Sequence, residues 1–369
     1  PVINGQIFIR DGADGGTVGN TASITLADLV INDSTGGAGD NPAILASGNT
    51  ADVTFINLDI TAPTSRNSGL IVTNHSGNIF LTNVVAGGTD NRGADIDNTA
   101  GSGTVTVTGS TFNGNNDDGL RVISDGLITL ANVTANQNDN NGADISNNTS
   151  DSVAGANVSV VNSTFNQNDV TSNHNAGLLV RSRGLITLVE VTANQNVNAN
   201  GADISNDVIN SVAGANIFVV KSTFNNNGND GLHAASNLDI ILINVTAQGN
   251  NNDGADLASD GDNLVICGGT FSGNNTGGGF TDYDVRGSGN TRTRSSDITI
   301  NSWRTSAGWT VVSNGTGPCN NPDSDTDQVP NQWDTDDDDD GVPDVNDAFP
   351  LDPSESVDTD SDGTGDNAD

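Results

Sequence analysis

"NVTANQNDNNGADIS", from Asn132 to Ser146, is the clearest architectural signal in this chain because it returns twice. It reappears as "EVTANQNVNANGADIS" from Glu190 to Ser205 and as "NVTAQGNNNDGADLAS" from Asn244 to Ser259. Self-similarity at such spacings is typical of repeat proteins, in which each unit stacks on its neighbours. The sequence therefore predicts an elongated stack of similar units.

A second kind of unit alternates with the first: "STFNGNNDDGLRV" from Ser110, "STFNQNDVTSNHNAGLLV" from Ser163 and "STFNNNGNDGLHA" from Ser222. Short β-branched runs precede the units at spacings of 23 to 33 residues, starting at Ile24, Val53, Ile79, Val105, Ile128, Val158, Ile186, Ile217, Ile240, Val265 and Ile298. Such runs, separated by Asn, Gly and Asp, indicate strands and turns. No helical period competes with this interpretation.

Alternation within each unit indicates which side chains face inward. Leu120 and Val122 in "GLRV" share one face, as do Ala143 and Ile145 in "GADI", because successive side chains of a strand point to opposite sides. Stacking then sets small Ala against larger Leu in neighbouring layers, so the layers interlock. The run starts predict about 11 to 12 rungs, each about 4.8 Å from the next.

Over residues 1–312 this pattern resembles the right-handed single-stranded parallel β-helix, the pectate-lyase-like fold. The resemblance implies an all-β domain in which one sheet face often carries catalysis. We expect turn asparagines such as Asn136 and Asn194 to tolerate left-handed conformations and to form hydrogen-bonded ladders.

The residue between the two inward positions forms an outward column, which consists of Ile71, Asp95, Arg121, Asp144, Leu179, Asp203, His233 and Asp256. Asp recurs on every second rung, roughly 9.6 Å apart, which is long for a paired catalytic acid and base. We interpret the column as a solvated face with Asp95–Arg121–Asp144 contacts. A carbohydrate or metal groove is the alternative.

Catalytic motifs are absent. A lyase of this fold needs a calcium cluster and a base, but Lys221 is the only lysine, and His75, His174 and His233 lie in unrelated contexts. No nucleophile motif or Cys-His metal spacing is present. We expect the chain not to be an enzyme, with a polysaccharide lyase or hydrolase as the alternative.

The charge balance excludes several partner classes. The chain has 47 acidic and 11 basic residues and a formal net charge of -36. Nucleic-acid binding needs a basic footprint, so neither a nucleic acid nor an anionic membrane surface is an expected partner. No run of 18 apolar residues is present for membrane insertion. Divalent cations are the natural counter-charge.

The two cysteines, Cys267 and Cys319, flank the end of the regular region. We expect a disulfide between them that staples the linker, although two free thiols are the simpler alternative. A disulfide implies an oxidising compartment, and we therefore expect an extracellular or cell-surface protein.

The acidic tail has the spacing of calcium-binding loops. From Asn320 onward there are 18 acidic residues and no basic one. Oxygen ligands at positions 1, 3, 5, 7, 9 and 12, with Gly at 6, define a calcium loop. Three frames fit, with ligands at Asp323, Asp325, Asp327, Val329, Asn331 and Asp334; at Asp336, Asp338, Asp340, Val342, Asp344 and Asp347; and at Asp358, Asp360, Asp362, Thr364, Asp366 and Asp369.

These frames resemble thrombospondin type 3 repeats, including the "DAFPLDPSE" spacer, and in that family calcium ions take the place of a hydrophobic core. Gln328 stands where Gly is usual in the first frame, and position 12 is Asp rather than Glu. We divide the chain into a β-helix (1–312), a linker (313–322) and the Ca²⁺-binding repeats (323–369).

The expected function is structural or adhesive: a secreted bacterial-type β-solenoid, joined head to tail into a calcium-stabilised extracellular fibre or matrix. Extracellular polysaccharide is a further expected partner. The alternatives are a polysaccharide-active enzyme and a monomeric carbohydrate-binding adhesin with a calcium-binding tether. Fold class alone does not separate these functions.

Overall fold

The computed structural model of this 369-residue chain is dominated by short parallel strands. It describes residues 1–10, 22–31, 42–61, 68–149, 156–169, 176–206, 215–259, 263–276, 284–288, 291–295, 299–300, 309–312, 319, 322–326, 331, 336–342, 344–359 and 363–367. Within these ranges no helix has the length and apolar character that crossing a membrane requires.

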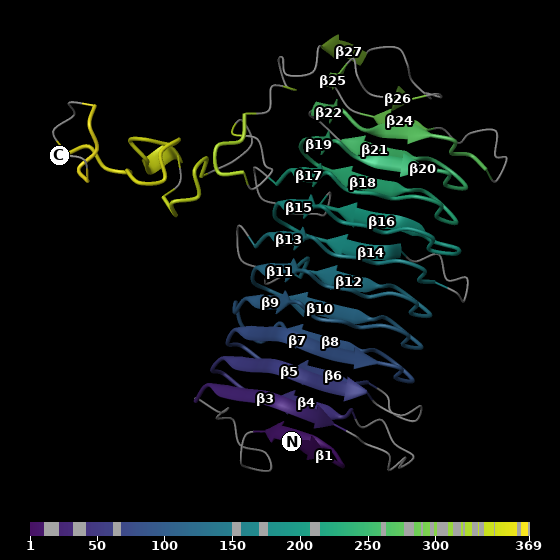
Figure 1. Ribbon diagram of the computed structural model, residues 1–369, viewed down its shortest axis with the longest axis vertical. Helices are drawn as coiled ribbons and strands as arrows, with labels where there is room; N and C mark the ends of the chain where they lie inside the picture. Colours follow the sequence, from purple (N-terminus) through teal and green to yellow (C-terminus); the bar gives the residue numbers. More distant parts are fainter. Residues whose placement is uncertain are drawn as a thin grey trace.

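The strands stack into two long parallel sheets that run the length of the solenoid (Figure 1). The 13-stranded sheet contains, in spatial order, β1 (Val2–Ile3), β3 (Ile24–Ile31), β5 (Val53–Thr61), β7 (Ile79–Gly87), β9 (Val105–Thr108), β11 (Ile128–Ala131), β13 (Val158–Val161), β15 (Ile186–Val189), β17 (Ile217–Val220), β19 (Ile240–Ile243), β22 (Asn263–Cys267), β25 (Thr291–Ser295) and β27 (Trp309–Val312). We call it sheet A.

The second long sheet, sheet B, has 11 strands. They are β2 (Ile7–Arg10), β4 (Ile44–Ser47), β6 (Leu70–Thr73), β8 (Ala94–Asn98), β10 (Leu120–Ser124), β12 (Ala143–Ser146), β14 (Ala176–Arg181), β16 (Asn200–Ser205), β18 (Leu232–Ser236), β21 (Ala255–Ser259) and β24 (Val285–Ser288). A 3-stranded sheet adds β20 (Thr246–Gln248), β23 (Thr270–Ser272) and β26 (Thr299–Ile300), and the tail contains one 3₁₀ turn, η2 (Asp344–Asn346).

From β1 to β19 consecutive strands alternate between the two long sheets, and the strands of the 3-stranded sheet are interposed after that; the pairings among the described strands are parallel. Parallel strands joined by crossovers are right-handed in nearly all proteins. The predicted all-β, right-handed parallel β-helix is therefore confirmed, and the strand numbers of the two sheets bracket the expected 11 to 12 rungs.

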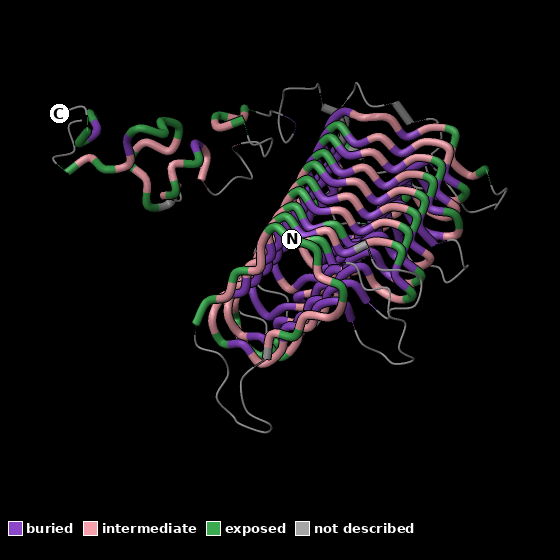
Figure 2. The backbone as a smooth tube through the Cα atoms, turned by 60° about the horizontal axis from the view of Figure 1, so that its bottom comes forward, coloured by how far each residue is buried: buried purple, intermediate pink, exposed green. Residues whose placement is uncertain are grey.

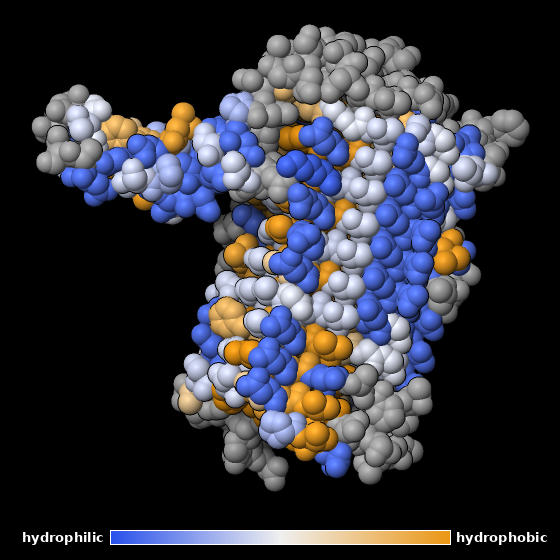
Figure 3. Space-filling view, viewed as in Figure 1, coloured by the Kyte–Doolittle hydropathy of each residue, from blue (hydrophilic) through white to orange (hydrophobic). Residues whose placement is uncertain are grey.

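The core lies inside the solenoid, where the inward side chains are buried. Figure 2 shows that buried residues recur at the same places from coil to coil, and Figure 3 shows hydrophilic residues in columns along the outside. In sheet B, Leu120, Ala143, Leu178 and Ala202 stack in one column, and all are fully buried. Large and small side chains thus alternate along this column, as the repeats predict. Such interlocking fills the interior without voids.

One of the expected strand starts is wrong. Leu264 rather than Val265 pairs with Ile240, because β22 begins at Asn263. The rung after β22 is formed by β25, which begins at Thr291, whereas Ile298 lies outside the described residues. Around β22 both faces are apolar, so alternation in the sequence does not fix the register there.

A ladder of buried asparagines lines one corner. Each side-chain amide donates to the next across six steps of 2.9–3.2 Å, through Asn115, Asn138, Asn168, Asn196, Asn227, Asn250 and Asn274. The ladder was expected at Asn136 and Asn194, two residues earlier. Those side chains instead accept hydrogen bonds from the backbone N–H groups of Asn166 and Asn225. The left-handed residues are Gln137 and Gln195.

The outer face of sheet A becomes apolar near its C-terminal end. Phe218, Ile241 and Val265 form a second buried cluster there, and Cys267 and Cys319 belong to it. The structure joins these two cysteines by a disulfide, with Cα atoms 5.4 Å apart. The chain is therefore fastened to the side of the solenoid immediately before the acidic tail.

Candidate functional site

The second calcium frame brings three carboxylates together. Candidate ligand oxygens of Asp336, Asp338 and Asp340 all lie within 4.8 Å of one another. Asp338 is the most enclosed, with 4% of its surface exposed. Its Oδ1 accepts a hydrogen bond from the Asp340 N–H (3.2 Å), whereas its Oδ2 is buried and makes no hydrogen bond among the described residues. Leaving a buried carboxylate oxygen without a partner is costly, so this atom is available to a cation.

The carboxylates at positions 9 and 12 of this frame, Asp344 and Asp347, accept hydrogen bonds from backbone N–H groups. Asp344 Oδ1 accepts a hydrogen bond from the Asp337 N–H (2.9 Å), and Asp347 Oδ1 accepts one from the Phe349 N–H (2.7 Å). The second oxygen of Asp347, Oδ2, is buried without a hydrogen bond in the described part of the chain. The frame therefore presents buried carboxylate oxygens on Asp338 and Asp347 that no group in the described part of the chain satisfies.

One hydrogen bond recurs at the same positions in all three frames. The backbone N–H at position 2 donates to the side-chain oxygen at position 9, from Ser324 to Asn331 (3.0 Å), from Asp337 to Asp344 (2.9 Å) and from Thr359 to Asp366 (2.8 Å). The three segments thus share this contact between positions 2 and 9 of the frame.

The glycine at position 6 has a second recurring role. Gly341 N–H donates to Asp336 Oδ2 (3.1 Å), and Gly363 N–H donates to Asp358 Oδ2 (3.0 Å). Both glycines have φ near +90°, a region that side-chain-bearing residues rarely adopt. Asp358 Oδ1 is buried and makes no hydrogen bond among the described residues. The third frame therefore repeats the geometry of the second at these positions.

Not every predicted ligand is placed. Asp327, Val329 and Asp334 of the first frame, and Asp360, Asp362 and Asp369 of the third, lie outside the described residues. Asp323, Asp325 and Asn331, and Asp358, Thr364 and Asp366, are described. Only the second frame shows all six of its positions, and it contains the carboxylate cluster.

The chemistry of the second frame fits a hard divalent cation. Burial raises the pKa of Asp338, and the nearby carboxylates of Asp340, Asp347 and Asp336 raise it further against the hydrogen bond from the Asp340 N–H. A cation relieves this mutual repulsion. The frame offers several oxygen ligands in an irregular loop, and Ca²⁺ tolerates irregular coordination by many oxygens better than Mg²⁺ does. The residues present therefore could hold a calcium ion.

The predicted outward column lies on sheet B as expected. Asp95, Arg121, Asp144, Leu179 and Asp203 are register partners on successive strands. Arg121 Nη1 contacts Asp95 Oδ1 at 2.8 Å, but no ion pair joins Arg121 to Asp144 among the described residues. The expected Asp95–Arg121–Asp144 contact is therefore formed on one side only.

Further along this column, Asp203 contacts an arginine and a histidine. Arg181 Nη1 lies 3.1 Å and His233 Nδ1 3.0 Å from its Oδ1. Burial acts to raise the pKa of Asp203, but the hydrogen bond from His233 and the charge of Arg181 outweigh it and lower the pKa. The same hydrogen bond raises the pKa of His233. Charges here are largely paired with one another.

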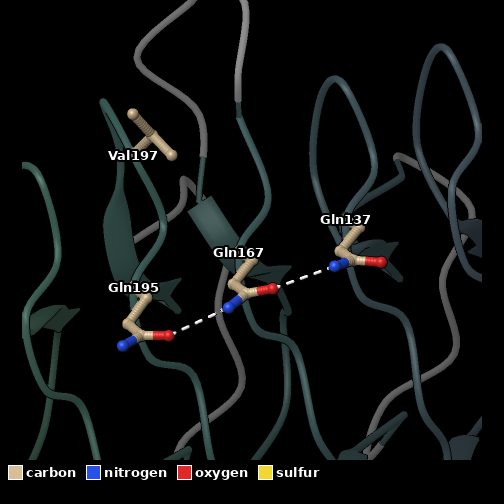
Figure 4. A pocket seen from close by; sticks show the side chains of 4 residues that line it. All are labelled: Gln137, Gln167, Gln195 and Val197. Atoms are coloured by element: carbon tan, nitrogen blue, oxygen red, sulfur yellow. Dashed lines mark hydrogen bonds between the residues drawn. The ribbon is translucent and has the colours of Figure 1, made fainter.

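A hollow on another face of the solenoid was not predicted. Gln137, Gln167, Gln195 and Val197 line a space of about 460 Å³ (Figure 4). The three amides form a row on successive coils: Gln137 Nε2 donates to Gln167 Oε1, and Gln167 Nε2 donates to Gln195 Oε1, each at 3.0 Å. The signal in the sequence is the triplet "NQN", repeated at 136–138, 166–168 and 194–196.

Comparisons with known proteins give little beyond the fold. No family model matches the chain, and no curated protein matches it. The mannuronan C-5 epimerase AlgE4 A-module of Azotobacter vinelandii is a solved structure that matches over 79% of this chain and 90% of its own, with 13% sequence identity and a TM-score of 0.38. No matching family supports the likeness of the tail to thrombospondin repeats.

The sequence-based expectation that the chain is not an enzyme is wrong. The matched module belongs to an epimerase, so the absence of familiar catalytic motifs in a β-solenoid does not exclude an activity. At this identity and TM-score, however, the likeness transfers neither a reaction nor a substrate to this chain.

Proposed function

We propose that this chain is a secreted structural and adhesive β-solenoid whose C-terminal loops are ordered by Ca²⁺. In this proposal residues 1–312 form a rigid rod, residues 313–322 link it to the tail, and residues 323–369 are thrombospondin type 3-like repeats. The observation that carries the proposal is the Asp336, Asp338 and Asp340 cluster, together with the buried Oδ2 of Asp338, which makes no hydrogen bond to any described residue.

Structural and adhesive proteins need a shape that persists, and the solenoid supplies it. Each coil is hydrogen-bonded to two neighbours, and the stacked asparagines add side-chain bonds along the same axis. The described part of the tail shows no comparable apolar core, since Leu351 and Val357 are exposed. The conformation of the tail must therefore be stabilised within its loops, and cations bound by the loop carboxylates would supply that stabilisation.

Calorimetric titration with Ca²⁺ tests the proposal. The intact chain should bind calcium, and replacing Asp338 and Asp340 together with Asn should remove at least one site. Asp339→Asn is the matched control, because Asp339 lies in the same loop, is exposed, and has φ 56°, where Asn is well tolerated. Equal binding by the parent and the double variant would contradict the assignment.

Head-to-tail assembly belongs to the same proposal. Heterologous contacts between the end of one rod and the tail of the next do not close, so they grow filaments. Electron microscopy of the protein with and without calcium tests this. Filaments that shorten on chelation support assembly, and single rods under both conditions contradict it.

A further inference from the structure

The Gln row occupies backbone positions that glutamine does not favour. Gln137, Gln167 and Gln195 have φ of 58°, 59° and 58°, in the left-handed region that costs an ordinary residue about 1–2 kcal/mol. The coil before the row has Gly114 at this position, and the coil after it has Asn226, the residue types that tolerate it best. Glutamines on three successive coils therefore adopt a strained backbone conformation that the neighbouring coils avoid by using Gly or Asn. Such strain is often found at binding sites.

The amides of the row keep hydrogen-bonding capacity for a ligand. An amide has two N–H donors and two acceptor positions, and the two bonds along the row use only part of these (Figure 4). Among the described residues, Gln195 Nε2 donates to no side chain and Gln137 Oε1 accepts from none. The row spans about 9.6 Å along the solenoid axis, so it offers donors and acceptors in line over three coils.

An apolar contact lies beside the row. Val197 follows the ladder residue Asn196, and 52% of its surface is exposed. The corresponding position in the two preceding coils is Asp139 and Asp169. An acid is thus replaced by a valine where the hollow lies, so its lining consists of three amides and one aliphatic side chain.

On the side of the row that leads into each Gln, the described outward positions are uncharged. Thr and Asn occupy the two outward positions that precede each Gln, in the pairs Thr134 and Asn136, Thr164 and Asn166, and Thr192 and Asn194. The Asn side chains are held by backbone N–H groups of the next coil at 2.6–2.7 Å. In a chain with a net charge of -36, a fixed neutral face of hydroxyls and amides favours a neutral, hydroxyl-rich ligand.

We propose that the Gln row and Val197 form a binding site for a neutral glycan chain lying along the solenoid axis. Sugar hydroxyls pair with the amides, and the C–H face of one ring packs on Val197. The hollow is open to solvent, as a site for a polymer lying along the surface must be. A neutral glycan would be the partner that the proposed adhesive function requires, and this inference rests on that proposed function.

Affinity electrophoresis tests the site in native gels that contain β-1,3-glucan, xylan or galactomannan, with polygalacturonate as the anionic comparison. The intact chain should be retarded by at least one neutral polymer and not by polygalacturonate. Absence of retardation by all three neutral polymers, or retardation by polygalacturonate alone, would overturn the proposal.

The decisive variant is Gln137→Asn/Gln167→Asn/Gln195→Asn. Asn suits the left-handed backbone, as Asn226 shows, so the fold is retained while each amide is shortened. Retardation should weaken by about tenfold or more. Gln248→Asn is the matched control, because Gln248 lies on the same face but bonds Ser272 (2.8 Å) outside the hollow. Equal retardation of the triple variant and the parent would place binding elsewhere and reject the site.

A chelator separates this proposal from the calcium proposal. Retardation that persists in excess EGTA supports the Gln site whether or not the tail binds calcium. Retardation that disappears in EGTA while the solenoid stays folded would assign binding to the tail and overturn the site. If the calorimetric titration detects no calcium binding but the gel retardation is unchanged, only the calcium proposal is contradicted.

Discussion

Replacing Asn168 with alanine should strongly destabilise the middle of the solenoid. Asn168 Oδ1 accepts hydrogen bonds from both the backbone N–H and the Nδ2 of Asn138, each at 3.0 Å. Its Nδ2 donates to Ala135 O (3.1 Å) and to Asn196 Oδ1 (3.2 Å). Alanine removes all four bonds from a fully buried position.

The magnitude follows from the groups left without partners. Asn138 would keep two buried donors that no longer reach an acceptor, Ala135 O would lose the amide that donates to it, and each such group costs about 1–3 kcal/mol. Asn196 Oδ1 retains the bond from the Asn168 backbone N–H (2.9 Å), so it adds little. We therefore expect a loss of about 3–9 kcal/mol in local stability.

Native-state hydrogen exchange measures this loss coil by coil, since a solenoid opens locally as well as globally. Peptides covering residues 133–142 and 163–169 should lose protection, whereas coils near β5 (Val53–Thr61) should not. Gln167→Ala is the control, because Gln167 is the exposed neighbour and Ala meets a similar backbone strain. A loss below about 1 kcal/mol, or an equal loss in the control, would refute the reasoning.

Three further predictions concern pH, the disulfide and assembly. Burial lowers the pKa of His75, so the stability that its neutral form contributes is full above about pH 6.5 and is lost as acid protonates the unfolded chain. The hydrogen bond to Asp203 raises the pKa of His233, so the stability that this contact contributes is full below about pH 6.5 and is lost as the pH rises through the folded-state pKa. Unfolding curves of His75→Gln and His233→Gln across pH should differ from the parent in these opposite ways, and parallel shifts would contradict the assignment. Replacing Cys267 and Cys319 with Ala should cost up to about 4 kcal/mol for a separation of 52 residues, and free thiols in native protein, detected by mass spectrometry without reduction, would count against the staple. Light scattering in calcium should show oligomers that shrink on chelation, and a monomer at high concentration would argue against head-to-tail growth.

The outward column on sheet B could be predicted residue by residue from the sequence. The period of a strand is two, and the inward Leu and Ala of each repeat are unambiguous, so Asp144 and Asp203 follow as outward residues. Where both faces are apolar the same reasoning fails, as it does for Val265 in β22. There the outer face is also buried, beside Cys319.

The asparagine ladder and the Gln row could not be separated by composition. Each "NQN" triplet offers Asn on both sides of Gln, and only the left-handed φ of Gln137 turns Asn138 inward and leaves Asn136 outward. In the tail, the spacing of the aspartates predicts which residues are candidate cation ligands. The convergence of Asp336, Asp338 and Asp340, and the burial of Asp338, depend on the folded path of the loop.

Hydrogen exchange of the whole chain with and without calcium tests the central claim most directly. Calcium should protect the backbone amides of residues 336–342 and 344–359, and excess chelator should remove that protection while the coils from β7 (Ile79–Gly87) to β19 (Ile240–Ile243) stay protected. A tail that is equally protected in chelator would contradict the claim that ions at these loops order it.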